Sequence, residues 1–229
     1  MSTKPQLING EFYHVYNRGV EKRSVFQAES DYFRFIRSLY EFNDKNLVSL
    51  KDRQRFKNRY YCHSYFHEKK LLVEILCFCL MPNHFHLILR QLVKSGISLF
   101  MQKLCGGYTG FFNLKYQRVG SLFQGPYKAK HISHEDYLIH LSRYLHINSV
   151  ELIEPNWKTE GVKDWEKVKD FLESYRWSSY LDYIGKENFP SVTSRDFILG
   201  FFDSFKDYKK FVYEWIIEDF NKIENLALE

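Results

Sequence analysis

The most constraining feature of this sequence is a pair of apolar, strand-forming runs separated by a three-residue turn. One run extends from Leu71 to Leu80 and the other from His84 to Arg90, with Met81, Pro82 and Asn83 between them. Runs of this length that are bounded by turn residues are typical of adjacent antiparallel strands. Both runs are strongly apolar, so we predict a hairpin whose two strands are central in a sheet.

Other predicted elements flank this hairpin along the chain. In chain order we predict a strand over 11–16, a helix over 31–43, the hairpin, a helix over 97–116, extended chain over 121–132 and a helix over 134–147. Ser30 is the expected N-cap of the first helix, and Ser133 with Asp136 resembles a capping box for the last. Gly106 and Gly107 predict a kink in the long helix. Residues 44–70 lack periodicity and predict a loop or an insertion.

The C-terminal third has a helical pattern throughout. We predict helices over 164–175, 194–202 and 205–223, with a turn over 185–190. The fold class is therefore α+β, with a central antiparallel sheet and packed helices. We predict one domain over 1–155 and a helical extension over 156–229.

Composition narrows the cellular setting and the class of partner. Lys and Arg number 33 against 28 Asp and Glu, and this net charge of +5 permits a polyanionic partner. The four cysteines, Cys62, Cys77, Cys79 and Cys105, form no C-x-x-C pair, and residues 1–10 lack an apolar secretory core. Residues 71–89 are interrupted by charged and turn-forming residues, which excludes a membrane span there. We expect a cytoplasmic protein without a membrane partner, with Cys77 and Cys79 in its core.

Two histidines alternate at the start of the second hairpin strand. Side chains in a strand alternate between faces, so His84 and His86 project from one side while Phe85 points to the other. Two imidazoles on one rigid strand suit a divalent metal ion. The alternative is a pair of ordinary surface or hydrogen-bonded histidines.

A tyrosine and an asparagine share one face of the helix that follows Ser133. Tyr144 and Asn148 are four residues apart, beside an apolar stripe that would pack against the sheet. If they face the histidines, the amide oxygen of Asn148 is a third metal ligand and Tyr144 lies beside a bound phosphate as nucleophile. Alternatively Tyr144 only packs. His140 shares this face, and a structural role is the favoured one for it over proton transfer.

These residues lie within strings that resemble a known family. Met81-Pro82-Asn83-His84-Phe85-His86-Leu87-Ile88-Leu89 resembles the HUH motif of the single-tyrosine transposases, in particular the REP-associated tyrosine transposases. Supporting strings are Tyr13 to Gly19, Met101-Gln102 with Tyr108, Phe112 and Asn113, Gly120 to Gly125 ahead of Tyr127, Arg143 to Asn148, and Tyr175 to Tyr180. Relatives have proline where this chain has Ser149.

The resemblance implies a ferredoxin-like HUH domain with the hairpin at the centre of the sheet. It implies that His84 and His86 bind Mg²⁺ or Mn²⁺, that Asn148 is an amide-bearing third ligand, and that Tyr144 is the nucleophile. Family members cut single-stranded DNA and leave a 5′-phosphotyrosine and a free 3′-hydroxyl.

A single-stranded DNA partner requires basic residues and exposed rings near the site. We single out Arg90, Lys115, Arg118, Lys128 and Lys130 with Tyr116 and Tyr127, and the alternative is that these residues are ordinary solvated faces. The predicted function is metal-dependent nicking and rejoining of single-stranded DNA, at a hairpin or palindromic repeat, by a monomer or a homodimer. Two alternatives stay open: a non-catalytic nucleic-acid-binding module of the same fold, and a metal hydrolase in which water attacks.

Overall fold

A computed structural model describes residues 6–46 and 69–218 of the chain. Most of the predicted insertion over 44–70, together with Cys62, lies outside the described residues, as does the end of the predicted C-terminal helix. Within the described ranges, no helix combines the length and the apolar character needed to cross a membrane.

The described strands form one four-stranded sheet in the order β2-β3-β1-β4. The strands are β1 (Phe12–Arg18), β2 (Val73–Met81), β3 (His84–Gln91) and β4 (Lys128–Ile132). Neighbouring strands are antiparallel, since Gly19 N–H donates to Asn83 O at one end of the β1–β3 pair and Gln91 N–H donates to Glu11 O at the other. The predicted α+β class and the hairpin are confirmed.

The prediction that both hairpin strands are central is wrong for β2, which is an edge strand of the sheet. Its outer edge is nevertheless paired, because Cys79 forms an antiparallel bridge with Ser178. Leu80 N–H donates to Trp177 O (2.9 Å) and Ser179 N–H donates to Phe78 O (3.0 Å). This loop protects the edge from water, which explains why an edge strand has the apolar sequence of a central one.

The chain forms two compact units that divide the hairpin strands between them. The first unit consists of the chain up to Glu74 with Pro82–His84 and Leu89–His131. The second unit consists of Ile75–Met81, Phe85–Ile88 and the chain from Ile132 onward. The predicted domain boundary near residue 155 stays a prediction.

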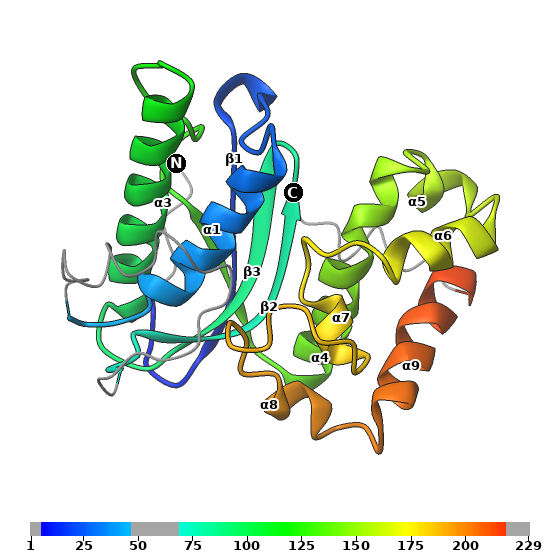
Figure 1. The fold of residues 1–229 in the computed structure, drawn as a ribbon. Coiled ribbons are helices and arrows are strands. Elements are labelled where there is room, and N and C mark those ends of the chain that lie inside the picture. Colours follow the sequence, from blue (N-terminus) through cyan, green and yellow to red (C-terminus); the bar gives the residue numbers. More distant parts are fainter. Residues whose placement is uncertain (1–5, 47–68, 219–229) are drawn as a thin grey trace. The chain divides into compact units, whose positions relative to one another are not determined.

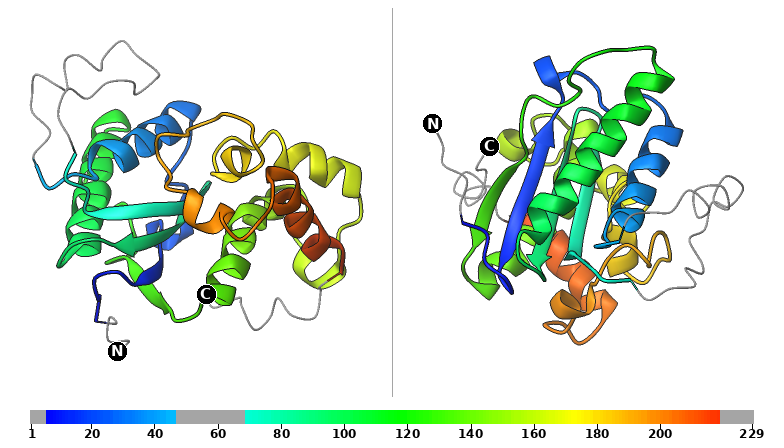
Figure 2. Two further views of the ribbon diagram at one scale, coloured as in Figure 1. Left: turned by 90° about the horizontal axis from the view of Figure 1, so that it is seen from below. Right: turned by 90° about the vertical axis from the view of Figure 1, so that its left-hand side faces the viewer.

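In the first unit, two long helices pack against each other beside the strands: α1 (Glu29–Glu41) and α3 (Gly96–Lys115). Figures 1 and 2 show them side by side. The predicted kink at Gly106 and Gly107 is absent, since α3 is continuous. A Cβ atom on Gly107 would lie only 2.6 Å from the Phe42 ring, so this glycine allows a close approach of the residue that caps α1.

The N-cap of α1 is Ala28 rather than the predicted Ser30. Asp31 performs the capping from inside the helix, because its carboxylate accepts from Gln27 N–H (2.8 Å) and Ala28 N–H (3.0 Å). The Asp31 side chain is fully buried and also accepts from Lys115 and Tyr116. Burial alone would raise its pKa, but these bonds hold the pKa of Asp31 below its ordinary value.

The second unit is mainly helical. Its helices are α4 (Glu135–Ile147), η3 (Asn148–Leu152), α5 (Trp157–Glu160), α6 (Trp165–Leu172), α7 (Tyr180–Tyr183), α8 (Asp196–Leu199) and α9 (Phe205–Glu218). Asp164 caps α6 by accepting from Lys167 N–H, at the predicted start of that helix. The predicted capping box is wrong, because His134 is the N-cap of α4 and no side chain caps it.

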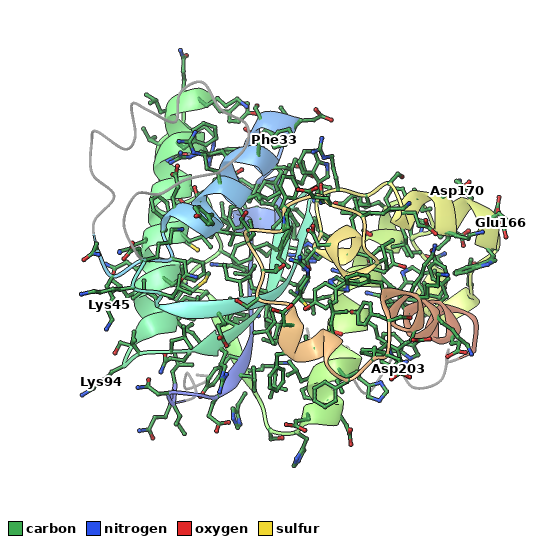
Figure 3. All side chains as sticks on the ribbon, turned by 60° about the horizontal axis from the view of Figure 1, so that its bottom comes forward. Phe33, Lys45, Lys94, Glu166, Asp170 and Asp203 are labelled. Carbon is green, nitrogen blue, oxygen red and sulfur yellow. The ribbon has the colours of Figure 1, made fainter. Side chains whose placement is uncertain are left out.

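Burial follows the expected division between core and surface. Cys77 and Cys79 are fully buried in β2, as predicted, and Tyr175 joins Cys79 in an apolar cluster of the second unit. Charged side chains such as Lys94 and Glu166 project outward (Figure 3).

Candidate active site

His84 begins β3, and its ring is oriented by the residue before it. The His84 Nδ1 atom lies 2.5 Å from Asn83 Oδ1. An amide oxygen can only accept, so the neutral imidazole carries its proton on Nδ1 and its lone pair on Nε2. The Asn83 amide is itself oriented, since its Nδ2 donates to Lys22 O (3.4 Å). His84 therefore presents Nε2 in the form that a metal ion requires.

The turn that bears Asn83 is held by backbone hydrogen bonds from the segment after β1. Pro82 O accepts from Val25 N–H (2.8 Å) and Phe26 N–H (3.0 Å), and Asn83 O accepts from Gly19 N–H (2.8 Å). A Cβ atom on Gly19 would lie 2.2 Å from a backbone oxygen, so only glycine fits there. We call this arrangement the hairpin clamp: residues 19–26 bonded to Pro82 and Asn83.

Two of the strings quoted from the sequence meet beside the hairpin clamp. Asn17 Nδ2 donates to Gly125 O (3.0 Å), and Gln124 N–H donates to Arg18 O (2.8 Å). The signal for this contact was present in the sequence as two separate glycine-containing strings. The sequence analysis did not predict that these two strings contact each other, because they lie more than one hundred residues apart in the chain.

His86 and Tyr144 both lie in the second unit and are nearly inaccessible to solvent. His86 is 1% exposed in β3, and Tyr144 is 4% exposed on α4. By strand alternation, His86 projects from the same side of β3 as His84. The Tyr144 ring packs edge-on against Trp215, with ring centroids 6.2 Å apart, and the Lys158 ammonium lies 5.4 Å from the centroid of the Tyr144 ring. The phenol thus has a charged neighbour and is not enclosed by aliphatic side chains alone.

Asn148 stands where α4 passes into η3, and it is 2% exposed. Its side-chain nitrogen is buried and has no hydrogen-bond acceptor among the described residues. Ser149, where relatives have proline, continues the helical backbone into η3 and is fully buried. A buried amide without a protein partner is costly unless a ligand completes it, so this position suits a ligand-binding role.

The helix that carries Tyr144 is held in place by His146, two residues later. His146 is fully buried, with Nδ1 2.7 Å from Tyr208 Oη and Nε2 2.8 Å from Ser179 Oγ. Burial lowers the pKa of His146 to about 3, so the ring is neutral. Ser179 Oγ in turn accepts from Phe78 N–H (3.0 Å), which links α4 to β2.

The hydrogen bonds around His146 run in one direction. Ser142 donates to Ile139 O (2.7 Å), so its oxygen accepts from Tyr208, 3.0 Å away. Tyr208 can then accept from Nδ1–H of His146 while Nε2 accepts from the Ser179 hydroxyl, whose other acceptor in reach is Phe78 O (3.3 Å). Every member is satisfied in this arrangement, and such a network specifies one position for the helix.

A second contact fastens α4 to α9. The Arg143 guanidinium lies 4.3 Å from the Phe211 ring centroid and 4.4 Å from that of Trp215. The same guanidinium donates to His140 Nδ1 (2.6 Å), so the contacts of His140 support the structural role favoured for it. Cation–π contacts on two rings hold Arg143 between the helices.

Several residues predicted to touch DNA are engaged within the first unit. Lys115 pairs with buried Asp31 (2.5 Å), and Arg90 bonds Gly10 O and Glu74. Tyr127 is 9% exposed and shares a hydrogen bond with Ser98. Arg118 donates to Asn113, and Tyr116 donates to Asp31. The Lys128 ammonium lies over the Tyr16 ring, and Lys130 is partly exposed in β4. Their role in DNA binding stays a prediction.

His84 and His86 offer two imidazole nitrogens from one strand as ligands for a divalent metal ion. Among the described residues, no group of three His, Cys, Asp or Glu side chains is placed to hold a metal ion. Two imidazoles favour a transition-metal ion such as Mn²⁺ over Mg²⁺, which prefers oxygen ligands.

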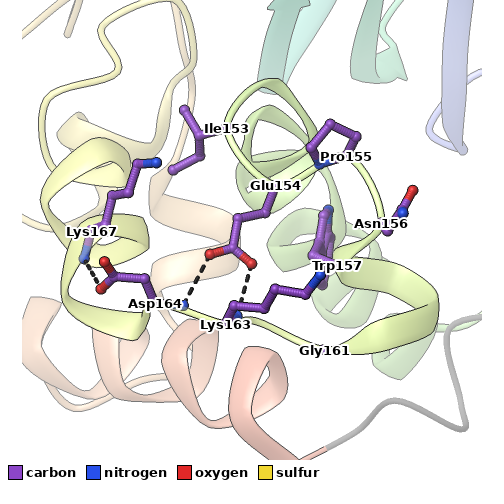
Figure 4. A pocket seen from close by; sticks show the side chains of 9 residues that line it. All are labelled: Ile153, Glu154, Pro155, Asn156, Trp157, Gly161, Lys163, Asp164 and Lys167. Atoms are coloured by element: carbon purple, nitrogen blue, oxygen red, sulfur yellow. Dashed lines mark hydrogen bonds between the residues drawn. The ribbon is translucent and has the colours of Figure 1, made fainter.

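The second unit contains a pocket whose lining residues follow the predicted site residues in the chain. Figure 4 shows its lining: Ile153, Glu154, Pro155, Asn156, Trp157, Gly161, Lys163, Asp164 and Lys167. The Glu154 carboxylate accepts from the backbone N–H groups of Lys163 (2.8 Å) and Asp164 (3.0 Å), which shapes the pocket wall. None of the predicted site residues lines it.

Comparison with known proteins identifies the part of the chain that contains the predicted site. Residues 45–148 match the model of the IS200-like transposase family. This match agrees with the resemblance to transposases that the sequence motifs suggest. The transposase match starts before the described hairpin and ends at Asn148, so it includes His84, His86 and Tyr144.

Among solved structures, the chain is similar to one described as a REP-associated tyrosine transposase bound to a REP hairpin. The two share 12% sequence identity with a TM-score of 0.47, over 85% of this chain and 91% of the other. No curated protein matches the chain.

Proposed function

We propose that this protein is a metal-dependent transposase that nicks and rejoins single-stranded DNA through a covalent bond to Tyr144. The observation that supports it most is the orientation of His84, whose Nε2 is held in the metal-binding form by Asn83 at the tip of the hairpin clamp. This feature lies within the residues that match the transposase family. A protein that only binds nucleic acid has no use for an imidazole oriented in this way.

His84 and His86 would hold Mn²⁺ or Mg²⁺, with Asn148 as the proposed third ligand. A bound divalent ion supplies positive charge that offsets the charge developing on a scissile phosphate. The residues of the chain supply the rest. The hairpin clamp limits the movement of His84, and the His146 network holds the helix that carries Tyr144.

Tyr144 is the proposed nucleophile. As its hydroxyl proton leaves, a bond forms between Oη and phosphorus, the bond from phosphorus to the DNA 3′ oxygen breaks, and that oxygen takes up a proton. Because Tyr144 is only 4% exposed, the helices around it must part to admit DNA. A hairpin or palindromic repeat is the proposed substrate, and the REP-associated tyrosine transposase to which the chain is similar is described as bound to a REP hairpin.

The test uses a hairpin oligonucleotide labelled on either side of each candidate cleavage site, incubated with Mn²⁺ and analysed on a denaturing gel. We expect protein-linked DNA with the natural protein and with Tyr137→Phe, a control tyrosine on the same helix, and none with Tyr144→Phe. Free cleavage products without an adduct would support a hydrolase in which water attacks. Binding without cleavage under every metal condition would support a non-catalytic module.

Metal binding is measured separately by calorimetry with Mn²⁺ alone. Replacing His84 or His86 with alanine should abolish the binding heat. His131→Ala is the matched control, because His131 is exposed and pairs with Glu11 (2.7 Å). Equal Mn²⁺ affinity in all four proteins would overturn the metal site.

A further inference from the structure

Lys158, on the short helix α5, is a charged residue close to the Tyr144 side chain. Its Nζ atom lies 5.4 Å from the centroid of the Tyr144 ring. The same ammonium donates to Glu151 Oε2 (3.2 Å) on η3. Only 26% of the Lys158 side chain is exposed, so this contact is shielded from bulk water.

From this geometry we propose that Lys158 is a positioning residue for Tyr144. Its positive charge beside the ring orients the phenol and stabilises the phenolate that forms as the hydroxyl proton leaves. Glu151 keeps the ammonium in place beside the ring. The proposal deepens the function proposed above and relies on Tyr144 being the nucleophile.

The ammonium of Lys158 acts as a charge and not as a base. Burial alone would lower the pKa of Lys158, but Tyr144 and Glu151 raise it above the ordinary value, so the group is protonated at neutral pH. A protonated ammonium has three donors and no acceptor, and it therefore cannot take the phenol proton. That proton leaves to water, while the positive charge lowers the free energy of the anion left behind.

Two other described residues beside Lys158 and Tyr144 differ from Lys158 in charge or in contacts. Trp215, which packs on the ring from α9, carries no charge. On α4 itself, the Arg143 guanidinium is stacked between the Phe211 and Trp215 rings and donates to His140. Glu151 is the anion that pairs with Lys158 (3.2 Å).

The direct test is a titration of the Tyr144 phenol by NMR in protein labelled with ¹³C at the tyrosine ring carbon that bears the hydroxyl. The Tyr144 signal is identified by its loss in Tyr144→Phe. We expect Lys158→Met to raise the phenol pKa by about one unit, a typical shift for loss of an adjacent charge. Lys158→Arg should restore the natural value, because it keeps the charge.

Lys163→Met is the matched control. Lys163 lies on the same stretch of the second unit and pairs with Glu160 (2.7 Å), on the exposed surface. Its removal should leave the Tyr144 titration unchanged. Equal titrations in Lys158→Met and Lys163→Met, or a shift in Lys158→Arg as large as that in Lys158→Met, would overturn the proposal.

The kinetic consequence is an approximately tenfold slower formation of the DNA adduct at pH 7 in Lys158→Met, which follows from one pKa unit. The rate should approach that of the natural protein as pH rises. If no variant forms an adduct, the proposed function fails, but the NMR titration still decides the role of Lys158. An altered titration with an unchanged adduct rate would reject Lys158 as a residue that assists the reaction.

Discussion

The buried His146 network predicts a specific loss of stability in mild acid. In the unfolded chain, His146 has an ordinary histidine pKa of about 6.5 and takes up a proton as the pH falls below that value. In the folded protein, burial lowers its pKa to about 3, and the ring stays neutral. The unfolded state therefore binds more protons between pH 6.5 and 3, so stability is complete above pH 6.5 and falls as the solution becomes more acidic.

The size of this loss follows from the two pKa values. Between pH 7 and pH 5, protonation of His146 in the unfolded state alone lowers the free energy of unfolding by about 2 kcal/mol. His146→Gln keeps a hydrogen-bonding side chain but cannot titrate. The loss of stability between pH 7 and pH 5 should therefore be about 2 kcal/mol smaller in the variant than in the natural protein.

Urea unfolding followed by tryptophan fluorescence measures this difference. All four tryptophans, Trp157, Trp165, Trp177 and Trp215, lie in the second unit, which contains the network, so their emission reports on the relevant unfolding. The variant also serves as the control for the other histidines, because both proteins contain them. Equal losses of stability in the two proteins between pH 7 and pH 5 would refute the reasoning.

Two further predictions concern the first unit. Gly107→Ala should destabilise the protein by about 1–3 kcal/mol, because the new Cβ would collide with Phe42, whereas Gly106→Ala, with open space around it, should stabilise α3 by up to about 1 kcal/mol. Urea unfolding monitored by circular dichroism compares them, and equal effects would contradict the packing argument. Asn83→Leu should weaken Mn²⁺ binding about 10–100-fold by releasing His84, and Asn156→Leu should not. Calorimetry measures both affinities, and unchanged binding in Asn83→Leu would reject the proposed orientation.

The hairpin was predictable because its signal is local. Two apolar runs, a turn and the alternation of His84 with His86 are all contained in about twenty residues, and strand geometry alone places both imidazoles on one side. The edge position of β2 was not predictable in the same way. Its outer edge is covered by residues 177–179, which lie about one hundred residues away in sequence.

The helix caps also depended on contacts that are distant in sequence, which local patterns do not reveal. Ser30 and Ser133 both stand where an N-cap is common, yet neither caps its helix. In α1 the buried carboxylate of Asp31 fills that role, because it also pairs with Lys115 from α3. A tertiary ion pair thus decided which residue caps the helix.

The sequence by itself determined the α+β class, the hairpin, the helical C-terminal third and the residue types of the candidate site, because these depend on periodicity and on motifs within short stretches. Only the tertiary structure decided that Asn83 orients His84, that His146 anchors the helix of Tyr144, and that the Lys158 ammonium lies near the Tyr144 ring. The contacts of His146 and Lys158 join residues that no periodic pattern in the sequence relates. The contact of Asn83 with His84 depends on the orientation of the Asn83 side chain, which donates to Lys22 O in the segment after β1. Such contacts arise only when the whole chain has packed, since the free energy that holds them comes from burial of many distant groups at once.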